Sequence, residues 1–247
     1  MRTEWIGNYL YFRARLDNNK QVLVDVDDGM KGYTYGDLNH RADRLANMFK
    51  DRFSLKRGDR VAFVSRNRVE LIDAYFATGK TGTILVPYNA RLSAAELASL
   101  VRSERPKVLF FEDIYEKNIA QIRDENLVEH LVVLSNGEQK LAYNEYHQLL
   151  EQAADKPVSC PELDMEDIHL IIHTGGTTGL PKGGLVSHRN ELFNAFNEIC
   201  SWGLNHEDKT LLLLPMFHTG GWQLLPLPLL HVGGTLYINR QYDPKKT

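Results

Sequence analysis

One stretch of the sequence decides the fold, Ile168-His-Leu-Ile-Ile-His-Thr-Gly-Gly-Thr-Thr-Gly-Leu-Pro-Lys-Gly183. Its first part, 168–172, is compact and largely apolar, which predicts a buried strand. The ten residues 174–183 contain four glycines, three threonines and a lysine. A strand that runs directly into a glycine-rich loop is typical of α/β proteins that bind an anion where the strand ends.

The loop has the residue types that a polyphosphate requires. Glycines permit positive φ and let backbone amides approach an anion closely. Threonine hydroxyls add donors, and Lys182 supplies a point charge that can meet a phosphate. A flexible surface turn is the alternative for a lone glycine-rich loop. The predicted phosphate-binding residues are Thr174, Gly175, Gly176, Thr177, Thr178, Gly179 and Lys182.

Two familiar nucleotide motifs are absent. A Walker A loop places Gly-Lys-Ser/Thr after a glycine and four residues, whereas Lys182 follows Pro181. The Gly-Lys-Thr at 79–81 has Ala74 where that first glycine should be. The GxGxxG dinucleotide fingerprint is missing too. The loop therefore predicts a phosphate site of another class.

Working outward from this loop, apolar strands and amphipathic helices alternate along the chain, which predicts an α/β fold of layered sheets and helices. Ser93 and Glu96 form a capping box that opens a helix ending before Pro106. The predicted strands are 60–64, 83–86 (stopped by Pro87), 108–111, 131–134, 168–172, 211–214 and 235–238. The predicted helices are 34 to about 53, 69–78, 93–105, one between the strands 108–111 and 131–134, 143–154 and 190–202.

A polar stretch, 155–167, contains two prolines and is the predicted boundary between two subdomains. The first covers 1–160, and 161–247 is the beginning of a second that carries the phosphate loop. Pro244, followed by charged residues, resembles the approach to a new helix. The chain is therefore expected to end in mid-architecture, a truncated form of a larger α/β domain.

Composition excludes several classes of function. The 247 residues are 43% hydrophobic and 25% charged, as in globular proteins, and 29 basic against 32 acidic residues give a net charge of −3. With a negative net charge, the chain lacks the overall positive potential that attracts nucleic acid. No apolar run reaches the roughly 18–20 residues of a membrane helix. Residues 1–16 lack the apolar core of a secretory signal. Two cysteines make no disulfide framework, so a cytoplasmic enzyme is predicted.

Residues 174–183 resemble the phosphate-loop signature of the AMP-forming acyl- and aryl-CoA synthetases, which belong to the adenylate-forming superfamily. Gly175 stands where serine is common in that signature. Residues 187–190 resemble the family's histidine-containing step into the next helix, and 34–38 resemble an early helix start. Residues 214–222, Leu-Pro-Met-Phe-His-Thr-Gly-Gly-Trp, resemble the motif that lines the carboxylate and acyl pocket.

The resemblance implies the N-terminal half of a ligase, since the family is about twice as long. Such enzymes convert ATP and a carboxylic acid to acyl-AMP and pyrophosphate, require Mg²⁺, and transfer the acyl group to coenzyme A. It implies catalytic roles for Thr177, Lys182 and His218. It also implies an acyl pocket lined by Phe217, His218, Gly220, Gly221 and Trp222.

His218 also bears on the acid. Adenylation domains for amino acids place an aspartate directly after the motif's phenylalanine, because a buried ammonium needs a counter-charge. Here His218 follows Phe217, which favours an acid with an apolar body, with fatty acids ahead of aromatic acids. Physical reasoning alone would make His218 a core histidine, and Trp222 is more often core than pocket wall.

Other signals are weaker. His147, His169 and His173 have no metal-ligand spacing, so no zinc site is predicted, and the metal ligands stay unknown. Asp25, with Asp27 and Asp28, predicts a turn and not a calcium loop. His188 is expected to be structural.

Two rival functions stay open: an aryl-CoA ligase or other adenylating enzyme, and a non-catalytic truncated nucleotide-binding protein. The isolated chain is expected to make no acyl-CoA. It is also expected to expose apolar surface along 211–214 and 235–238, and so to self-associate or form a homo-oligomer.

Overall fold

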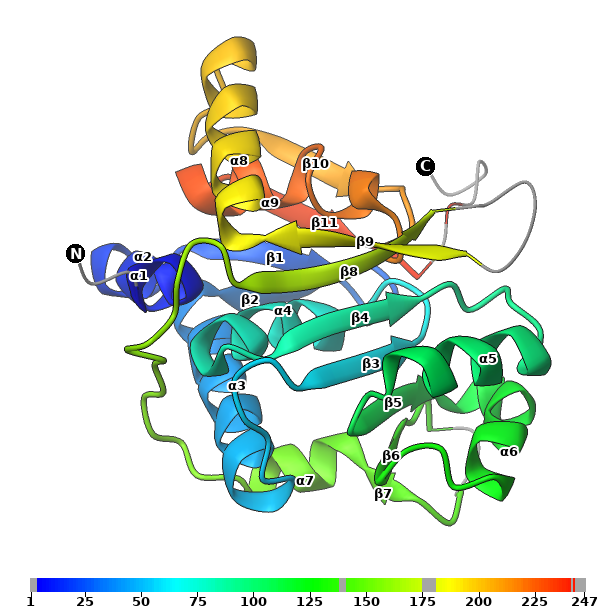
Figure 1. The fold of residues 1–247 in the computed structure, drawn as a ribbon. Helices are drawn as coiled ribbons and strands as arrows, with labels where there is room; N and C mark the ends of the chain where they lie inside the picture. The colour runs from blue at the N-terminus through cyan, green and yellow to red at the C-terminus, as the bar shows by residue number, and fades with distance from the viewer. Residues whose placement is uncertain (1–3, 138–140, 175–180, 241, 243–247) are drawn as a thin grey trace.

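The computed structural model describes residues 4–137, 141–174, 181–240 and 242, and its larger sheet has seven strands. All neighbours in it are parallel except the last pair, β8 and β9, which are antiparallel. Helices cover both faces of this sheet (Figure 1). In spatial order the strands are β7 (Asn144–Glu145), β6 (His130–Leu134), β5 (Val108–Glu112), β3 (Arg60–Val64), β4 (Ile84–Tyr88), β8 (Ile168–Thr174) and β9 (Lys182–Ser187).

The core lies on the two faces of this sheet because its central strands are apolar on both sides. In β3, Val61 and Phe63 point into one buried cluster, and Ala62 and Val64 point into the other. Phe63 stacks on Phe110 of β5 with ring centroids 4.7 Å apart. The first cluster packs against α3 (Tyr35–Asn47), α4 (Val69–Thr81) and α7 (Tyr146–Gln152), and the second against α5 (Ala94–Glu104) and α6 (Glu116–Asp124).

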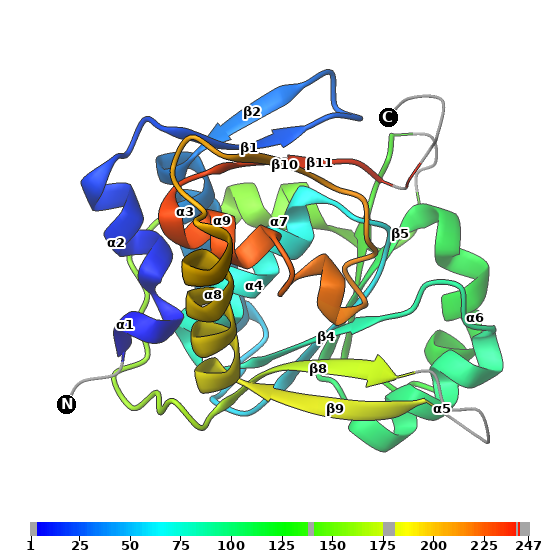
Figure 2. The same cartoon turned by 90° about the horizontal axis from the view of Figure 1, so that it is seen from above.

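A second sheet of four strands joins segments from opposite ends of the chain. Its spatial order is β10 (Lys209–Leu212), β11 (Thr235–Ile238), β1 (Gln21–Asp25) and β2 (Lys31–Thr34). Strand β1 is parallel to β11 and antiparallel to β2. Figure 2 shows the β1–β2 pair lying alongside β10 and β11. Both sheets take strands from before and after residue 160, and the division into two subdomains stays a prediction.

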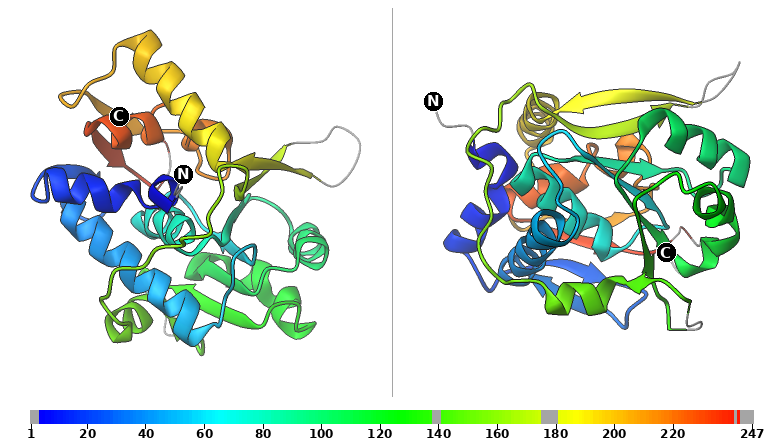
Figure 3. Two further views of the ribbon diagram at one scale, coloured as in Figure 1. Left: turned by 60° about the vertical axis from the view of Figure 1, so that its left-hand side comes forward. Right: turned by 60° about the horizontal axis from the view of Figure 1, so that its bottom comes forward.

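Four further α-helices complete the described chain: α1 (Glu4–Gly7), α2 (Tyr9–Leu16), α8 (His188–Trp202) and α9 (Pro226–Val232). Helix α8 packs against α9, and α1 contacts both α4 and α8 (Figure 3). The long helix α8 begins with a capping box, in which the Ser187 hydroxyl accepts from the Asn190 amide. No helix in the described residues is long and apolar enough to cross a bilayer.

The α/β fold predicted from the sequence is confirmed, and strands 60–64 and 235–238 have the predicted bounds. The capping box of Ser93 and Glu96 is present. The prediction that Pro87 stops its strand is wrong, because β4 continues to Tyr88. Pairing between β4 and β8 is confined to Leu85 and Leu170, so a missing N–H at residue 87 costs this side of the strand little.

Other predicted bounds also shift. The first long helix ends as an α-helix at Asn47 and continues as one π-helical turn, η1 (Met48–Arg52). Strand β10 stops at Leu212, two residues before the predicted end. Strands β1, β2, β7 and β9 were not predicted, and the helix predicted for 143–154 begins only at Tyr146 because β7 occupies 144–145. Strand β9 begins Lys-Gly-Gly, a composition that reads as loop until its partner β8 is known.

Candidate functional site

The described part of the predicted phosphate site is the pair of strand ends that flank the loop. Thr174 ends β8, Lys182 begins β9, and the two are direct cross-strand partners. The Thr174 hydroxyl donates to the Lys182 carbonyl oxygen at 3.4 Å. Both residues are exposed, and Lys182 makes no ion pair with any described residue. A cation without an ion pair to any described residue and a hydroxyl therefore lie side by side. We call the pair Thr174 and Lys182 the stem.

The rest of the predicted loop lies outside the described residues. Gly175, Gly176, Thr177, Thr178 and Gly179 belong to this group. Their predicted roles in phosphate binding, and the catalytic role of Thr177, stay predictions. The stem alone fixes where the loop leaves and rejoins the sheet.

The stem occupies the edge of the sheet where α/β proteins bind ligands. Strand β8 is parallel to β4, so Thr174 lies at the same edge as the carboxyl ends of β3 to β6. In open α/β sheets, ligands bind outside the carboxyl ends of the strands. The position of the stem agrees with a substrate phosphate site at this edge.

The second predicted site segment, 214–222, forms a tight chain of turns. Residues Thr219–Gly221 make one 3₁₀ turn, η3. His218 is exposed, so the core-histidine alternative is wrong, and Phe217 is half-buried beside it with ring centroids 5.4 Å apart. Trp222 is fully buried, as the core alternative predicted; its indole N–H donates to the Met216 carbonyl, and its ring stacks on Tyr75.

The two glycines of this segment differ in their surroundings. A Cβ at Gly221 would overlap the carbonyl oxygen of Pro215, so this glycine is required by a close approach of the backbone. A Cβ at Gly220 would meet only the Leu214 side chain, 2.7 Å from its Cδ1. Gly220 also borders an apolar cavity of about 300 Å³. The cavity is lined by Thr210, Leu211, Leu212, Leu213, Leu214, Gly220, Leu224, Leu225 and Pro226.

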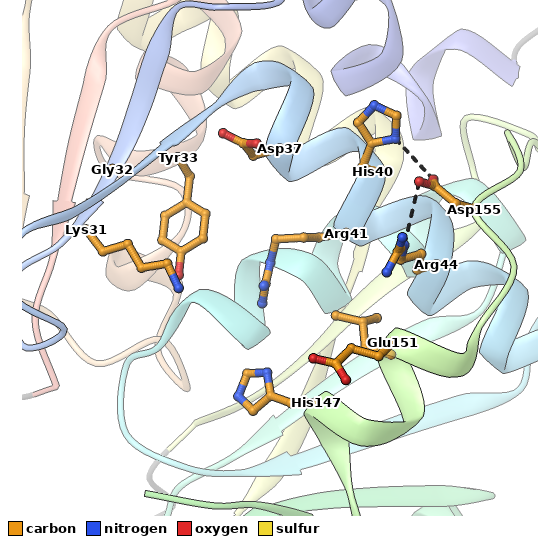
Figure 4. Close-up of a pocket in the computed structure, with 11 residues that line it drawn as sticks. Lys31, Gly32, Tyr33, Asp37, His40, Arg41, Arg44, His147, Glu151 and Asp155 are labelled. Atoms are coloured by element: carbon orange, nitrogen blue, oxygen red, sulfur yellow. Dashed lines mark hydrogen bonds and ion pairs between the residues drawn. The ribbon is translucent and has the colours of Figure 1, made fainter.

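A larger cleft of about 550 Å³ lies elsewhere, between α3, α7 and β2 (Figure 4). Several of its charged side chains are paired, either with one another or with residues outside its lining. His40 Nδ1 lies 3.1 Å from one oxygen of Asp155, and Arg44 Nε lies 3.6 Å from the other. Arg41 binds Asp73 through two guanidinium nitrogens. None of its lining residues comes from the stem or from 214–222, so this cleft is not assigned to the predicted chemistry.

A buried cluster that the sequence did not predict joins β8 to α8. His169, His188 and Glu191 place ligand-type atoms within 4.8 Å of one another. His169 Nδ1 is 2.7 Å from Glu191 Oε2. The His169 and His188 rings stack, with centroids 4.3 Å apart and planes 16° apart. Stacked imidazoles hold their lone pairs in nearly parallel planes, which is unfavourable for binding one cation together. The absence of zinc stays a prediction.

Burial and a neighbouring histidine determine the protonation state of His188. Burial lowers the pKa of His188 well below its ordinary value, and the neighbouring His169 lowers it further. His188 is therefore neutral in the folded protein. His169 Nε2 contacts the Tyr75 carbonyl oxygen at 2.9 Å, and the Tyr75 hydroxyl donates to Glu191 Oε2 at 3.2 Å. The structural role expected of His188 fits this closed surrounding.

Residues 12–247 match the family described as AMP-binding enzyme. The chain belongs to this family. It is 32% identical over 245 residues to indoleacetate–CoA ligase of Aromatoleum aromaticum, and 29% identical over 244 residues to feruloyl-CoA synthase of an Amycolatopsis species. Each match covers 99% of this chain and 46% of the relative. The chain thus spans about half the length of these curated relatives.

Solved structures agree with this assignment. The N-terminal domain of FACL13 from Mycobacterium tuberculosis is 27% identical, with a TM-score of 0.82, and the match covers all of this chain and 59% of that one. Anthranilate CoA ligase AuaEII, solved with anthranoyl-AMP, has a TM-score of 0.87 at 24% identity over 96% of this chain and 45% of its own. The second likeness shows the fold alone. The predicted N-terminal-half architecture of an adenylate-forming enzyme is confirmed.

Proposed function

We propose that this chain is the N-terminal part of an ATP-dependent, AMP-forming ligase that activates a carboxylic acid and transfers it to coenzyme A. The observation that carries the proposal is the stem. Lys182, which makes no ion pair with the residues that the structure describes, lies beside Thr174 at the carboxyl edge of the sheet and flanks the glycine-rich loop. Family membership supports the same reaction class.

The chemistry follows from what a carboxylate lacks. It is a poor acyl donor until one of its oxygens becomes part of a good leaving group. A carboxylate oxygen attacks the α-phosphorus of ATP, the bond to the bridging oxygen breaks, and pyrophosphate leaves. The thiolate of coenzyme A then attacks the acyl carbon and AMP departs. Negative charge spreads over the transferred group, where Lys182 and loop amides can stabilise it.

ATP enters such a reaction as its magnesium complex, so Mg²⁺ is treated as part of the substrate. Glu104 is the carboxylate that the structure places beside the stem, and both of its oxygens are engaged by His173 and Tyr88. We therefore assign Glu104 no role as a metal ligand. The ion would arrive on the phosphates.

For the acid, we infer an apolar body, with a fatty acid as the first candidate. Support comes from the leucine-lined cavity next to Gly220 and from His218 in place of a carboxylate that would pair with an ammonium group. An aryl acid is the second candidate, because the relatives named above are a feruloyl-CoA synthase and an indoleacetate–CoA ligase. We also propose a cytoplasmic location, in keeping with two free thiols, Cys160 and Cys200.

Calorimetry with Mg-ATP tests the nucleotide site on the chain itself. Removing a charge-assisted contact costs roughly 1.5–3 kcal/mol, so Lys182→Ala should weaken binding by about 10- to 100-fold. Lys209→Ala, an exposed lysine at the start of β10, is the matched control. Equal affinities for Lys182→Ala and the wild type would remove the stem from the proposed site.

The acid site is tested by ligand-detected NMR with decanoate, hexadecanoate and indoleacetate. Gly220→Leu fills the cavity without touching backbone, so it should reduce binding of the long acids most. Gly221→Leu is unsuitable, since its side chain would displace Pro215. Uniform loss for every acid with Gly220→Leu would place the acid elsewhere.

A further inference from the structure

Beneath the stem lies a carboxylate to which the proposed reaction gives no role. Glu104 is the last residue of α5. Its Oε1 is 2.6 Å from His173 Nε2, and its Oε2 accepts from the Tyr88 hydroxyl at 2.8 Å. The His173 and Glu104 side chains are 5% and 14% exposed. A nearly buried carboxylate thus bridges the carboxyl ends of two neighbouring strands, β4 and β8.

Strand β9 closes over this carboxylate. Gly183 is the direct ladder partner of His173. A Cβ at Gly183 would lie 3.1 Å from Glu104 Oε1 and 2.7 Å from Ile171 Cγ2. Such distances are tighter than ordinary contact, so Glu104 packs against bare backbone at this position. Glu104 therefore touches both strands of the stem, one residue before Thr174 and one residue after Lys182.

The hydrogen-bond roles in this cluster have one consistent assignment. Burial, and then the charge of Glu104, raise the pKa of Tyr88 well above its ordinary value, so its hydroxyl stays a donor. For Glu104 as a carboxylate, which only accepts, the matching His173 tautomer carries its proton on Nε2. Glu104 then accepts from one donor on each strand. An acceptor held by two donors from different elements fixes their separation.

We propose that Glu104 is a positioning residue for the phosphate-binding stem. It clamps the carboxyl ends of β4 and β8 against the backbone of β9, so that Thr174 and Lys182 face the polyphosphate at a fixed separation. This inference rests on the proposed function. Holding the two groups before ATP arrives reduces the ordering that binding would otherwise require.

Two variants of Glu104 distinguish a local positioning role from a contribution to the stability of the whole domain. Glu104→Ala removes both contacts. In Glu104→Gln the side-chain oxygen can still accept from Tyr88. The amide N–H can donate to His173 Nε2 once the ring carries its proton on Nδ1, so this variant should rescue the geometry. The control is Glu125→Ala, which removes an exposed carboxylate at the end of α6 that pairs with Arg102 of α5. Each protein is examined by calorimetry with Mg-ATP and by amide hydrogen exchange at residue 174 and residues 182–184.

Glu104→Ala should weaken Mg-ATP binding about tenfold and speed exchange at these amides about tenfold, as expected for loss of a charged hydrogen bond. Glu104→Gln should stay within about threefold of the wild type for both, and Glu125→Ala should match the wild type. Exchange in β3 and β5 should be unchanged in all three.

Two results would overturn the inference. One is Glu104→Ala with wild-type affinity and wild-type exchange at the stem. The other is faster exchange throughout β3 and β5, which would make Glu104 a general stabiliser. A wild-type chain that binds no Mg-ATP would instead contradict the proposed function. The exchange rates alone would then decide whether Glu104 holds the stem.

Discussion

Strand β8 carries two histidines, His169 and His173, and each contacts a helix carboxylate and a tyrosine from a third element. The same three residue types therefore meet twice on one strand. Their surroundings differ. The first cluster is enclosed between α4 and α8, whereas the second lies directly below the exposed stem.

The enclosed cluster contains Glu191, which is 4% exposed and has one oxygen without a described partner. In the same cluster, the ring of His188 from α8 stacks on the ring of His169. In the stem cluster, both oxygens of Glu104 have hydrogen-bond partners. The exposed residues Thr174 and Lys182 lie next to this cluster in the β8–β9 ladder. The comparison indicates that the same chemistry serves packing at one end of β8 and local geometry at the other.

The largest expected effect separates the clusters by stability. Glu191→Ala leaves His169 and the Tyr75 hydroxyl, both buried, without their carboxylate partner. Removing one partner of a buried pair typically costs about 3–5 kcal/mol of stability. Glu104→Ala, at the edge of the sheet, should cost well under half of that. Urea denaturation measures both. Equal losses in the free energy of unfolding would show that both clusters contribute equally to stability, which contradicts this prediction.

A second prediction concerns the reaction in an active ligase that contains this chain. Lys182→Ala should slow ATP–pyrophosphate exchange, because it removes a cation that faces developing negative charge. The expected loss of transition-state stabilisation is about 2–4 kcal/mol. Its urea midpoint should stay that of the wild type, since Lys182 is exposed. An unchanged exchange rate would exclude it from adenylation.

Acid pH should weaken the enclosed cluster first. The folded-state pKa of His188 is lowered by burial, so below the ordinary histidine pKa of about 6.5 the unfolded chain binds a proton that the folded chain does not. Stability contributed by neutral His188 is thus complete above about pH 6.5 and falls with decreasing pH, by at most about 1.4 kcal/mol per unit. His231, whose pKa is lowered to about 4, acts in the same direction.

Urea midpoints of the wild type and His188→Phe between pH 7 and 5 check this expectation. The variant should show the shallower slope. A matched variant, His231→Phe, isolates the second contribution. Parallel slopes for wild type and both variants would contradict the assignment of the acid response to buried neutral histidines.

The smallest effect on stability is expected on the outer face of α8, opposite Glu191. Phe193 and Phe196 are exposed there with ring centroids 6.4 Å apart. Phe193→Ser with Phe196→Ser should change stability by about 0.5 kcal/mol or less but reduce self-association of the chain. Sedimentation at several concentrations measures it. Unchanged association would place the contact on another surface.

The sequence predicted those parts of the fold that depend on neighbouring residues. The capping box of Ser93 and the apolar strand 60–64 are local patterns, and both are present. The π-helical turn after Asn47 is missed because its residues still follow a helical apolar period. Strand β9 is missed because its glycines have no strand preference of their own and are held by pairing with β8.

The site divides in the same way. Lys182 and Thr174 were predicted from composition within ten residues, and the structure places them side by side. Glu104 was not predicted, because 69 residues separate it from His173 and only the fold brings them together. Glu191 and His169 are 22 residues apart and meet for the same reason. A pattern within one segment cannot reveal such pairs.

The pairing of β1 with β11 also sets an order of events during synthesis. Leu23 lies opposite Leu236, so β1 cannot complete its pairing until β11 has been synthesised. A ribosome adding roughly 5–20 residues per second needs about 10–40 s to make the intervening chain. During that interval the β1–β2 hairpin presents an unpaired edge to its surroundings. Late closure of this sheet leaves the β1–β2 segment exposed to other chains and to holding chaperones until β11 emerges.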